Sequence, residues 1–404
     1  MENVTKTVID CIKYEIRGQN EKIVLPEISA RFLIEVYKLS KAHDVAHLVG
    51  DALNKSGVFE NLPADLDENE RATIEKIKEK FDEQIFTAVY RYENINYELE
   101  QICKTLEEAK IPFIPLKGSV IRKYYPEPWM RTSCDIDILI HQEDVERTIE
   151  LLVKNGYEHQ SDATTHDYSF ITPGKVHLEL HYSLNQGERM EAINAILDMV
   201  WVCSSPFKES PYCFQMSNDM FVFYHIAHMA KHFIAGGCGI RSFIDLYLLK
   251  KNGYCNSIQL SLLLEKANLS IFYESAMKLV EVWFEDQPHD SITESMESFV
   301  LTGGVYGSAT NAAAVKASKG ESKFKSFFKL MFLSRKRLEI IYPSLHKHPI
   351  LLPLYQIKRW LRIFNSKKRK RILNLVAARN SVSKNEIDCV GDLLEALKIK
   401  GLSN

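Results

Sequence analysis

The feature that most restricts the fold of this chain is a change of hydrophobic period at Ile111. Before it, apolar residues recur at three- and four-residue spacing, as in "SARFLIEVYKLSKAHDVAHLVGDAL", which predicts amphipathic helices. From 111 to 183, short runs alternate apolar and polar residues between prolines and glycines, which predicts strands. Helical spacing returns near residue 218. The sequence therefore predicts a small sheet between two helical regions.

The strand-forming stretch also predicts an order of elements. "IPFIPL" is a short strand, "KGS" is a turn, and Ser119 is expected to cap the helix "VIRKYY". "CDIDILI" is a second strand, and "HDYSFITPGKVHLELHYSL" predicts a hairpin with strands near 166–171 and 175–183. The fold class is α+β, with a small mixed β-sheet core flanked by N- and C-terminal helical regions. The expected regions are 1–100 (helical), 101–200 (α/β core), 201–310 (helical domain) and 311–404 (basic, helical).

Two acids stand in a strand that is otherwise apolar. In "CDIDILI", Asp135 and Asp137 share one face, ~7 Å apart along the strand, and the isoleucines share the other. Ionised carboxylates so placed repel each other unless they are exposed, paired with a cationic side chain, or bridged by a metal ion. In "KVHLELHYSL", Glu179 shares its face with His177 and His181. If the two strands are neighbours with polar faces aligned, three carboxylates converge.

Three carboxylates make an oxygen-rich site that suits Mg²⁺ or Mn²⁺, and two such ions would clamp an in-line phosphoryl displacement. Glu179 would then be a metal ligand or the general base. Upstream, Lys117, Gly118 and Ser119 form a turn at the start of a helix, where backbone N–H groups and a lysine favour an anion. An isolated DxD is common and proves little, so the prediction depends on this turn and on Glu179.

These motifs, in this order, resemble the uncharacterised bacterial nucleotidyltransferase family of the DNA polymerase β-like superfamily. The family shows a KG turn, a Tyr-Pro-x-Pro-x-x-Arg segment, a DIDLLV strand, a helix ending near Gly-Tyr, and an acid two residues before a histidine. They match "LKGS", "YPEPWMR", "DIDILI", "KNGYE" and "ELH". The resemblance extends to "HMAKHF", "RSFIDLYLL" and "LEIIYP…LLPLYQIKRWLR", and covers roughly residues 30 to 365.

The resemblance implies metal ligands at Asp135, Asp137 and Glu179, with two divalent ions, and triphosphate contact near Lys117–Ser119. It makes 101–200 the nucleotidyltransferase core and 201–310 the helical domain that completes the nucleotide pocket. The reaction would move a nucleoside monophosphate from an NTP, ATP among them, to an acceptor hydroxyl. The acceptor stays open: a small molecule, a sugar, a protein or RNA. This chain departs from the family in having Glu rather than Asp at 179, and a longer gap before the DxD.

Other polar residues have competing interpretations. Lys231 is either a nucleotide-phosphate ligand or a solvated lysine. Arg131 either neutralises the nearby acids or binds a phosphate of the nucleotide. His225, His228 and His232 share one helix face, which favours a polar packing surface over a zinc site because no Cys or acid supports them. Arg241 and Asp245 are spaced either for an i, i+4 ion pair or for a role in the pocket.

Charge is concentrated near the C-terminus. The net charge is −2, yet residues 316–371 hold seventeen Lys or Arg and two acids, with prolines at 343, 349 and 353 expected to break the helices. The segment is either a solvated helical face or a surface for nucleic acid or anionic lipid. The alternative function is therefore a nucleic-acid- or membrane-binding protein with a vestigial catalytic site. The eight scattered cysteines and the lack of a long apolar run predict reduced thiols, no transmembrane segment and a cytoplasmic location.

Overall fold

A computed structural model describes residues 2–18, 22–160, 167–187, 189–305, 307–322, 328, 331–342, 344–364 and 376–402. Its main sheet has five strands in the order β1-β2-β5-β4-β3. The strands are β1 (Phe113–Pro115), β2 (Asp135–Ile140), β3 (Glu158–His159), β4 (Asp167–Ile171) and β5 (His177–His181). Only β2 and β5 pair in parallel, and the other three pairings are antiparallel. The predicted small mixed sheet and the β4–β5 hairpin are confirmed.

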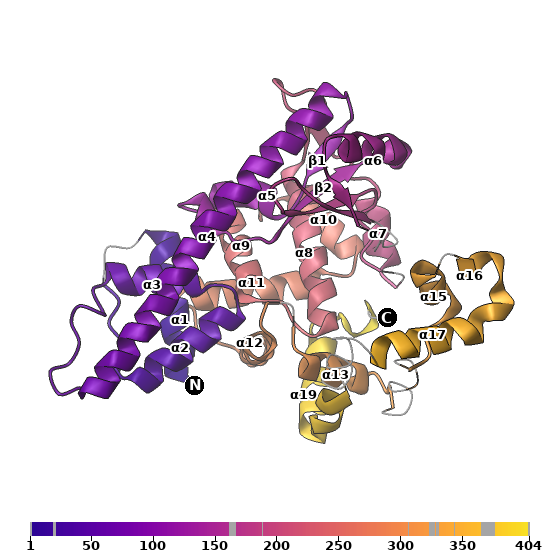
Figure 1. The fold of residues 1–404 in the computed structure, drawn as a ribbon. Coiled ribbons are helices and arrows are strands. Elements are labelled where there is room, and N and C mark those ends of the chain that lie inside the picture. Colours follow the sequence, from indigo (N-terminus) through magenta and orange to yellow (C-terminus); the bar gives the residue numbers. More distant parts are fainter. Residues whose placement is uncertain are drawn as a thin grey trace.

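Helices on the N-terminal side form the first layer. They are α1 (Glu2–Arg17), α2 (Ala30–Ala42), α3 (Ala46–Lys55) and α4 (Glu68–Glu108). Asp67 caps α4 by accepting a hydrogen bond from the Glu70 amide, and 41 residues of helical spacing follow without a proline. Figure 1 shows α4 running from the N-terminal helices up to the sheet. This helix joins the two parts of the molecule.

Short helices and turns connect the strands, and longer helices follow the sheet. They are α5 (Gly118–Ile121), η1 (Arg122–Tyr124), η2 (Pro128–Met130), η3 (Gln142–Asp144), α6 (Val145–Lys154), α7 (Glu191–Leu197), α8 (Asn218–Ala235), α9 (Ile240–Lys251), α10 (Ile258–Lys266), α11 (Ser270–Glu285) and α12 (Ser291–Gly303). A two-stranded sheet of β6 (Ser204–Pro206) and β7 (Phe214–Met216) precedes α8. Gly236 ends α8 with φ +131°, a conformation that favours glycine. The helix α8 lies below the sheet in Figure 1.

The described C-terminal elements are α13 (Ala309–Ser318), α15 (Arg335–Ile341), α16 (Ser344–Lys347), η4 (Pro349–Leu351), α17 (Leu352–Phe364), α19 (Lys384–Ala396) and η5 (Lys400–Leu402). Helix α17 begins at Leu352, so Pro353 stands in its first turn and does not break it, because a first-turn proline loses no helical hydrogen bond. Within the predicted basic segment, residues 323–327, 329–330, 343 and 365–371 lie outside the described residues, and with them the expected helix break at Pro343. In the described part of the chain, no helix has the length and apolar character needed to cross a membrane.

The core has two main parts. One packs the inner face of the sheet, including Ile136, Ile138 and Leu178, against the C-terminal half of α4 and against α6. The larger one joins the N-terminal helices to α8, α9 and α11. The alternating isoleucines of β2 thus belong to the first core, and the acids between them face the other way, toward α8 and α9.

Candidate active site

The parallel pairing of β2 with β5 brings the predicted acids together. Asp137 stands opposite Glu179 in the register, and Asp135 stands opposite His177. The intervening side chains of Ile136, Ile138, Leu178 and Leu180 are completely buried. Since side chains alternate along a strand, burying these four turns the acids to the opposite face. The predicted neighbourhood of the two strands is therefore confirmed.

Asp137 is the most enclosed of the three predicted acids, with 3% of its surface exposed. Lys117 Nζ donates to Asp137 Oδ1 at 2.8 Å, and His181 Nε2 lies 2.8 Å from the same oxygen. Burial alone would raise the pKa of Asp137, but Lys117 and His181 outweigh it and hold that pKa well below its usual range. Asp137 is therefore a permanent anion whose charge is balanced by side chains.

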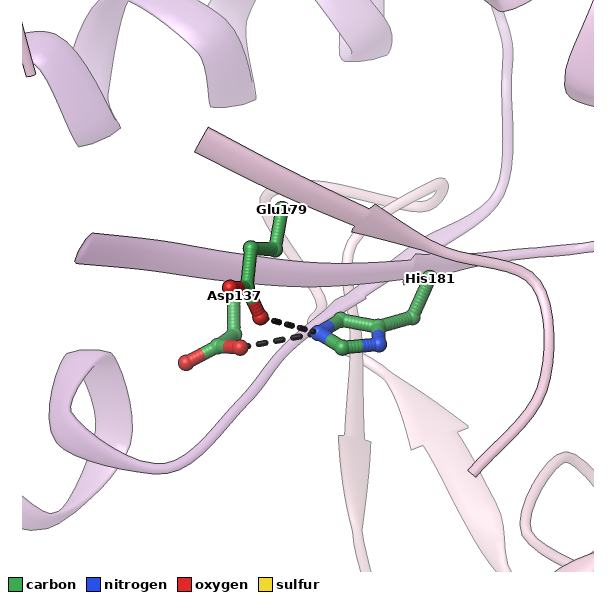
Figure 2. Close-up of side chains that lie close together, drawn as sticks. All are labelled: Asp137, Glu179 and His181. Atoms are coloured by element: carbon green, nitrogen blue, oxygen red, sulfur yellow. Dashed lines mark hydrogen bonds and ion pairs between the residues drawn. The ribbon is translucent and has the colours of Figure 1, made fainter. Parts of the chain in front are cut away.

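His181 was not singled out by the sequence, although it shares a strand face with Glu179. Its Nε2 lies 3.4 Å from Glu179 Oε2 as well as near Asp137 (Figure 2). Burial lowers the pKa of His181, but the hydrogen bonds to Asp137 and Glu179 raise that pKa by more than burial lowers it, so the net shift is upward. Ligand atoms of Asp137, Glu179 and His181 all lie within 4.8 Å of one another, and this is the one such trio among the described residues. The motif "ELH", in which the histidine follows the acid by two residues, is the sequence signal that could have identified His181 as a member of this trio.

Asp135, although predicted as a ligand, is not a member of this trio. It is partly buried and lines the same cavity. Burial and the charge of Asp137 raise the pKa of Asp135, in contrast to its neighbour. The two acids of the DxD therefore have different electrostatic environments: one is paired with cations and the other is repelled by its neighbour.

The turn before β2 differs in detail from the expectation. Helix α5 begins at Gly118, so Ser119 stands inside it and is not its cap. The reason is that Lys117 adopts φ +43° and ψ −118° and takes the N-cap position, so the helix begins two residues earlier than expected. A Cβ added at Gly118 would lie 3.3 Å from Ser133 Cβ, so glycine here permits close approach of the chain's own loop. Lys117 and Gly118 line the cavity, whereas Ser119 does not.

The cavity has a volume of about 360 Å³ and lies between the open face of β2 and β5 and the helices α8 and α9. Lys231 of α8 lines it and has no hydrogen-bond or ion-pair partner among the described residues. Burial, and then the charge of Lys117, lowers the pKa of Lys231. Arg241 of α9 also lines the cavity but is tied to Asp44 at 2.9 Å and to the Thr132 carbonyl at 3.0 Å. Among the Lys and Arg side chains that line the cavity, Lys231 thus has the fewest polar partners.

The three histidines of α8 do not gather round one point. His228 and His232 approach with their Nε2 atoms 3.0 Å apart, while His225 Nε2 lies 3.0 Å from the Ser242 carbonyl. Burial, together with Lys231 and Lys117, lowers the pKa of His232 to about 4. These residues form a neutral wall of the cavity, as the packing interpretation expected.

Arg131 has a different partner from the one predicted. Its Nε and Nη2 donate to Asp245 at 2.8 and 2.9 Å, and Nη1 donates to the Thr132 carbonyl at 2.7 Å. Tyr125 Oη donates to the same Asp245 carboxylate at 2.7 Å. The prediction that Arg131 neutralises the DxD acids is therefore wrong, as is the i, i+4 pair of Arg241 with Asp245. Both arginines instead join loops to α9, and a phosphate contact of Arg131 stays a prediction.

Comparison with known proteins gives one match. The model of a family described as uncharacterised nucleotidyltransferase matches residues 34–285. This range includes the sheet, the helices α8 and α9 and, except for Val305, the residues that line the cavity. The resemblance over 286–365 lies outside this match. No curated protein and no solved structure matches the chain. The matched region spans more than half of the sequence and contains every candidate site residue, so this chain belongs to that nucleotidyltransferase family and is a transferase of the nucleotidyl-transferring class.

Proposed function

We propose that this protein is a divalent-metal-dependent enzyme that moves a nucleoside monophosphate from an NTP to an acceptor hydroxyl, with release of pyrophosphate. The observation that carries the proposal is the facing pair Asp137 and Glu179 on adjacent parallel strands, with Asp135 on the same face of β2. All three line one cavity with the cations Lys117 and Lys231. Acids and cations in one cavity are what a metal–triphosphate ligand requires.

The residues present fit a divalent cation. Asp137 is buried and ionised, and its charge is balanced by the Lys117 ammonium and by His181, so the site already holds positive charge against its carboxylates. Carboxylate oxygens are the ligands that Mg²⁺ and Mn²⁺ prefer. Asp135, Asp137 and Glu179 would hold the metal, as one or two ions. Bound there, it would lower the pKa of the attacking hydroxyl and offset the triphosphate charge.

The cationic side chains supply phosphate contacts. Lys117 lines the cavity beside its partner Asp137, and Lys231 lines it from α8. We assign both to the triphosphate, with the Gly118 backbone beside them and Arg131 as an indirect contributor that fixes the loop before β2. The predicted contact of Ser119 is not retained, because Ser119 does not line the cavity and its amide donates to the Leu116 carbonyl. Partial burial strengthens such charge-assisted hydrogen bonds because water competes less.

We assign Glu179 to the acceptor side of the site. Its side chain is 29% exposed, against 4% for that of Asp137, so an incoming hydroxyl reaches Glu179 more readily. It serves either as the metal ligand nearest the nucleophile or as the base that accepts the hydroxyl proton. The proposed acceptor is a hydroxyl of a small molecule, a sugar, a protein side chain or an RNA end, and the proposed donor is one of the four NTPs.

The test is pyrophosphate release with each NTP, Mg²⁺ or Mn²⁺, and a panel of acceptors. The double variant Asp135→Asn with Asp137→Asn should lose at least about a thousandfold in rate, as expected when charge stabilisation in a transition state is removed. The matched control is Asp388→Asn with Asp392→Asn, two exposed acids of α19. Equal rates for the site variant and the wild type would refute the assignment. Isothermal titration with Mn²⁺ separates loss of metal from loss of turnover.

A further inference from the structure

Helix α17 presents its apolar side to solvent. Leu354, Ile357 and Leu361 are 61%, 48% and 66% exposed, whereas Gln356 on the opposite side is 5% exposed. A surface helix of a globular protein ordinarily buries its apolar stripe and exposes its polar one. The orientation of α17 is therefore the reverse of the usual one.

Specific hydrogen bonds hold α17 in this orientation. Gln356 Nε2 donates to the Leu333 carbonyl at 2.7 Å. Arg359 Nη1 and Trp360 Nε1 donate to the Met331 carbonyl at 2.9 and 2.7 Å. Three N–H donors of the inner side are thus bonded to backbone carbonyls of the preceding segment, whereas the Gln356 Oε1 atom is buried without a hydrogen-bond partner among the described residues. Rotating the helix to bury its leucines would break all three bonds.

The exposed row extends beyond the helix itself. Ile350, in the turn η4 just before it, is 92% exposed, and positions 350, 354, 357 and 361 follow the spacing of one helix face. Phe332, 42% exposed, packs edge-on against Trp360 at 5.1 Å. A contiguous exposed apolar patch in a water-soluble protein marks an interaction site. Figure 1 shows α15, α16 and α17 away from the sheet, so this patch is separate from the catalytic cavity.

Charge indicates what the patch contacts. Lys358 is exposed on α17 directly beside the apolar row, and the surrounding sequence 316–371 has seventeen Lys or Arg against two acids. An occupant must therefore be both apolar and anionic. Nucleic acid provides the anion, but aliphatic side chains do not stack on bases, and Trp360 donates its N–H inward. The interface of an anionic phospholipid bilayer provides both.

We propose that α17, with Ile350, docks this protein on anionic membrane surfaces, lying in the interface plane with its apolar row among the acyl chains and Lys358 among the headgroups. This property goes beyond nucleotidyl transfer and does not depend on it. No helix of the described chain spans a membrane, so the attachment is peripheral and reversible.

The experiment is co-sedimentation of the full chain with phosphatidylcholine vesicles, with and without phosphatidylserine. Ile357→Gln with Leu361→Gln removes part of the apolar row. Its matched control is Ile258→Gln with Leu262→Gln, the same residue pair at the same spacing on α10, 82% and 44% exposed. Wild type and control should bind phosphatidylserine vesicles, and the α17 variant should bind at least about tenfold more weakly, from the lost apolar burial. Salt should weaken the binding of all three.

Three results would overturn the proposal. The first is that wild type does not sediment with anionic vesicles. The second is equal binding by the α17 variant and the α10 control, which would mean that charge alone attracts the protein. The third is that the patch binds a different partner. A second copy of the chain would be indicated by a dimer in light scattering that the α17 variant abolishes. RNA would be indicated if a single-stranded RNA binds the wild type and the α17 substitutions weaken that binding. Pyrophosphate release in solution should be equal in all variants, so this test and that of the proposed function fail independently.

Discussion

Replacing Asp245 by Asn tests how the wall of the cavity is held in place. Asp245 is 1% exposed and accepts hydrogen bonds from Tyr125 and from two nitrogens of Arg131, which is itself 9% exposed. An amide keeps the shape but removes the charge, and it turns an N–H group toward the guanidinium. Arg131 is then a buried cation without its counter-ion.

The magnitude follows from the burial of both partners. Removing one partner of a buried ion pair costs about 3–5 kcal/mol, because the remaining charge cannot reach water. With a urea m-value of roughly 2–3 kcal/mol per molar, the midpoint of unfolding should fall by about 1–2 M. Asp10→Asn breaks the exposed pair with Lys6, which is worth only about 0.3–0.5 kcal/mol, and serves as the control.

The assay is urea unfolding followed by circular dichroism, with a rescue variant. Arg131→Met together with Asp245→Leu removes both charges and should recover most of the lost stability, less about 1–3 kcal/mol for the hydroxyl of Tyr125, which loses its acceptor. If Asp245→Asn shifts the midpoint no more than Asp10→Asn does, the variant does not leave Arg131 as a buried cation without a counter-ion, and the argument is refuted. A double variant no more stable than the single one would equally refute the argument.

Three further predictions concern the cavity. Burial lowers the pKa of His232 to about 4, from about 6.5 in the unfolded state, so between these pH values the unfolded state binds a proton that the folded state does not. The stability of the protein should therefore fall as the pH drops from about 6.5 to 4. His232→Gln should make the melting temperature less dependent on pH over this range. Lys117→Met should lower the melting temperature of the metal-free protein, because it removes the cationic partner of Asp137. It should also tighten Mn²⁺ binding about tenfold in calorimetry, because no ammonium group then competes for the carboxylate. Lys250→Met, which breaks the salt bridge of Lys250 with Glu281 outside the cavity, should leave the metal affinity unchanged. Lys231→Met should weaken NTP binding about tenfold without changing the melting temperature, whereas Lys266→Met on α10 should change neither; equal NTP affinities would remove Lys231 from the site.

The two strands that carry the candidate site residues could be predicted from sequence, because alternation along each strand is a local pattern. Alternation alone places Asp135 and Asp137 on one face of β2 and Glu179 with His181 on one face of β5. The hairpin follows from its turn residues, and the resemblance links the two strands. These predictions needed only short stretches in which burial of one face leaves no other arrangement.

Long-range partners could not be predicted in that way. Asp245 pairs with Arg131, 114 positions away, and not with Arg241 one helical turn away. Spacing along a helix says which side chains can meet, but tertiary packing decides which do, and here Arg241 turns to Asp44 of the N-terminal region. The start of α5 was missed for a related reason, since it depends on a backbone conformation that lysine rarely adopts.

The backbone of Lys117 has a consequence for how the site stores energy. Its φ of +43° and ψ of −118° lie close to the first central position of a type II′ turn, where glycine is the favoured residue. Holding a lysine there costs of order 1–3 kcal/mol, which the surrounding packing and the bond to Asp137 must offset. The bond between Lys117 and Asp137 therefore stabilises the unliganded protein, whereas binding of a metal or phosphate at this site requires that bond to break. A ligand that draws the ammonium away from Asp137 also frees the turn to relax, and part of its binding free energy would then come from the protein's own backbone.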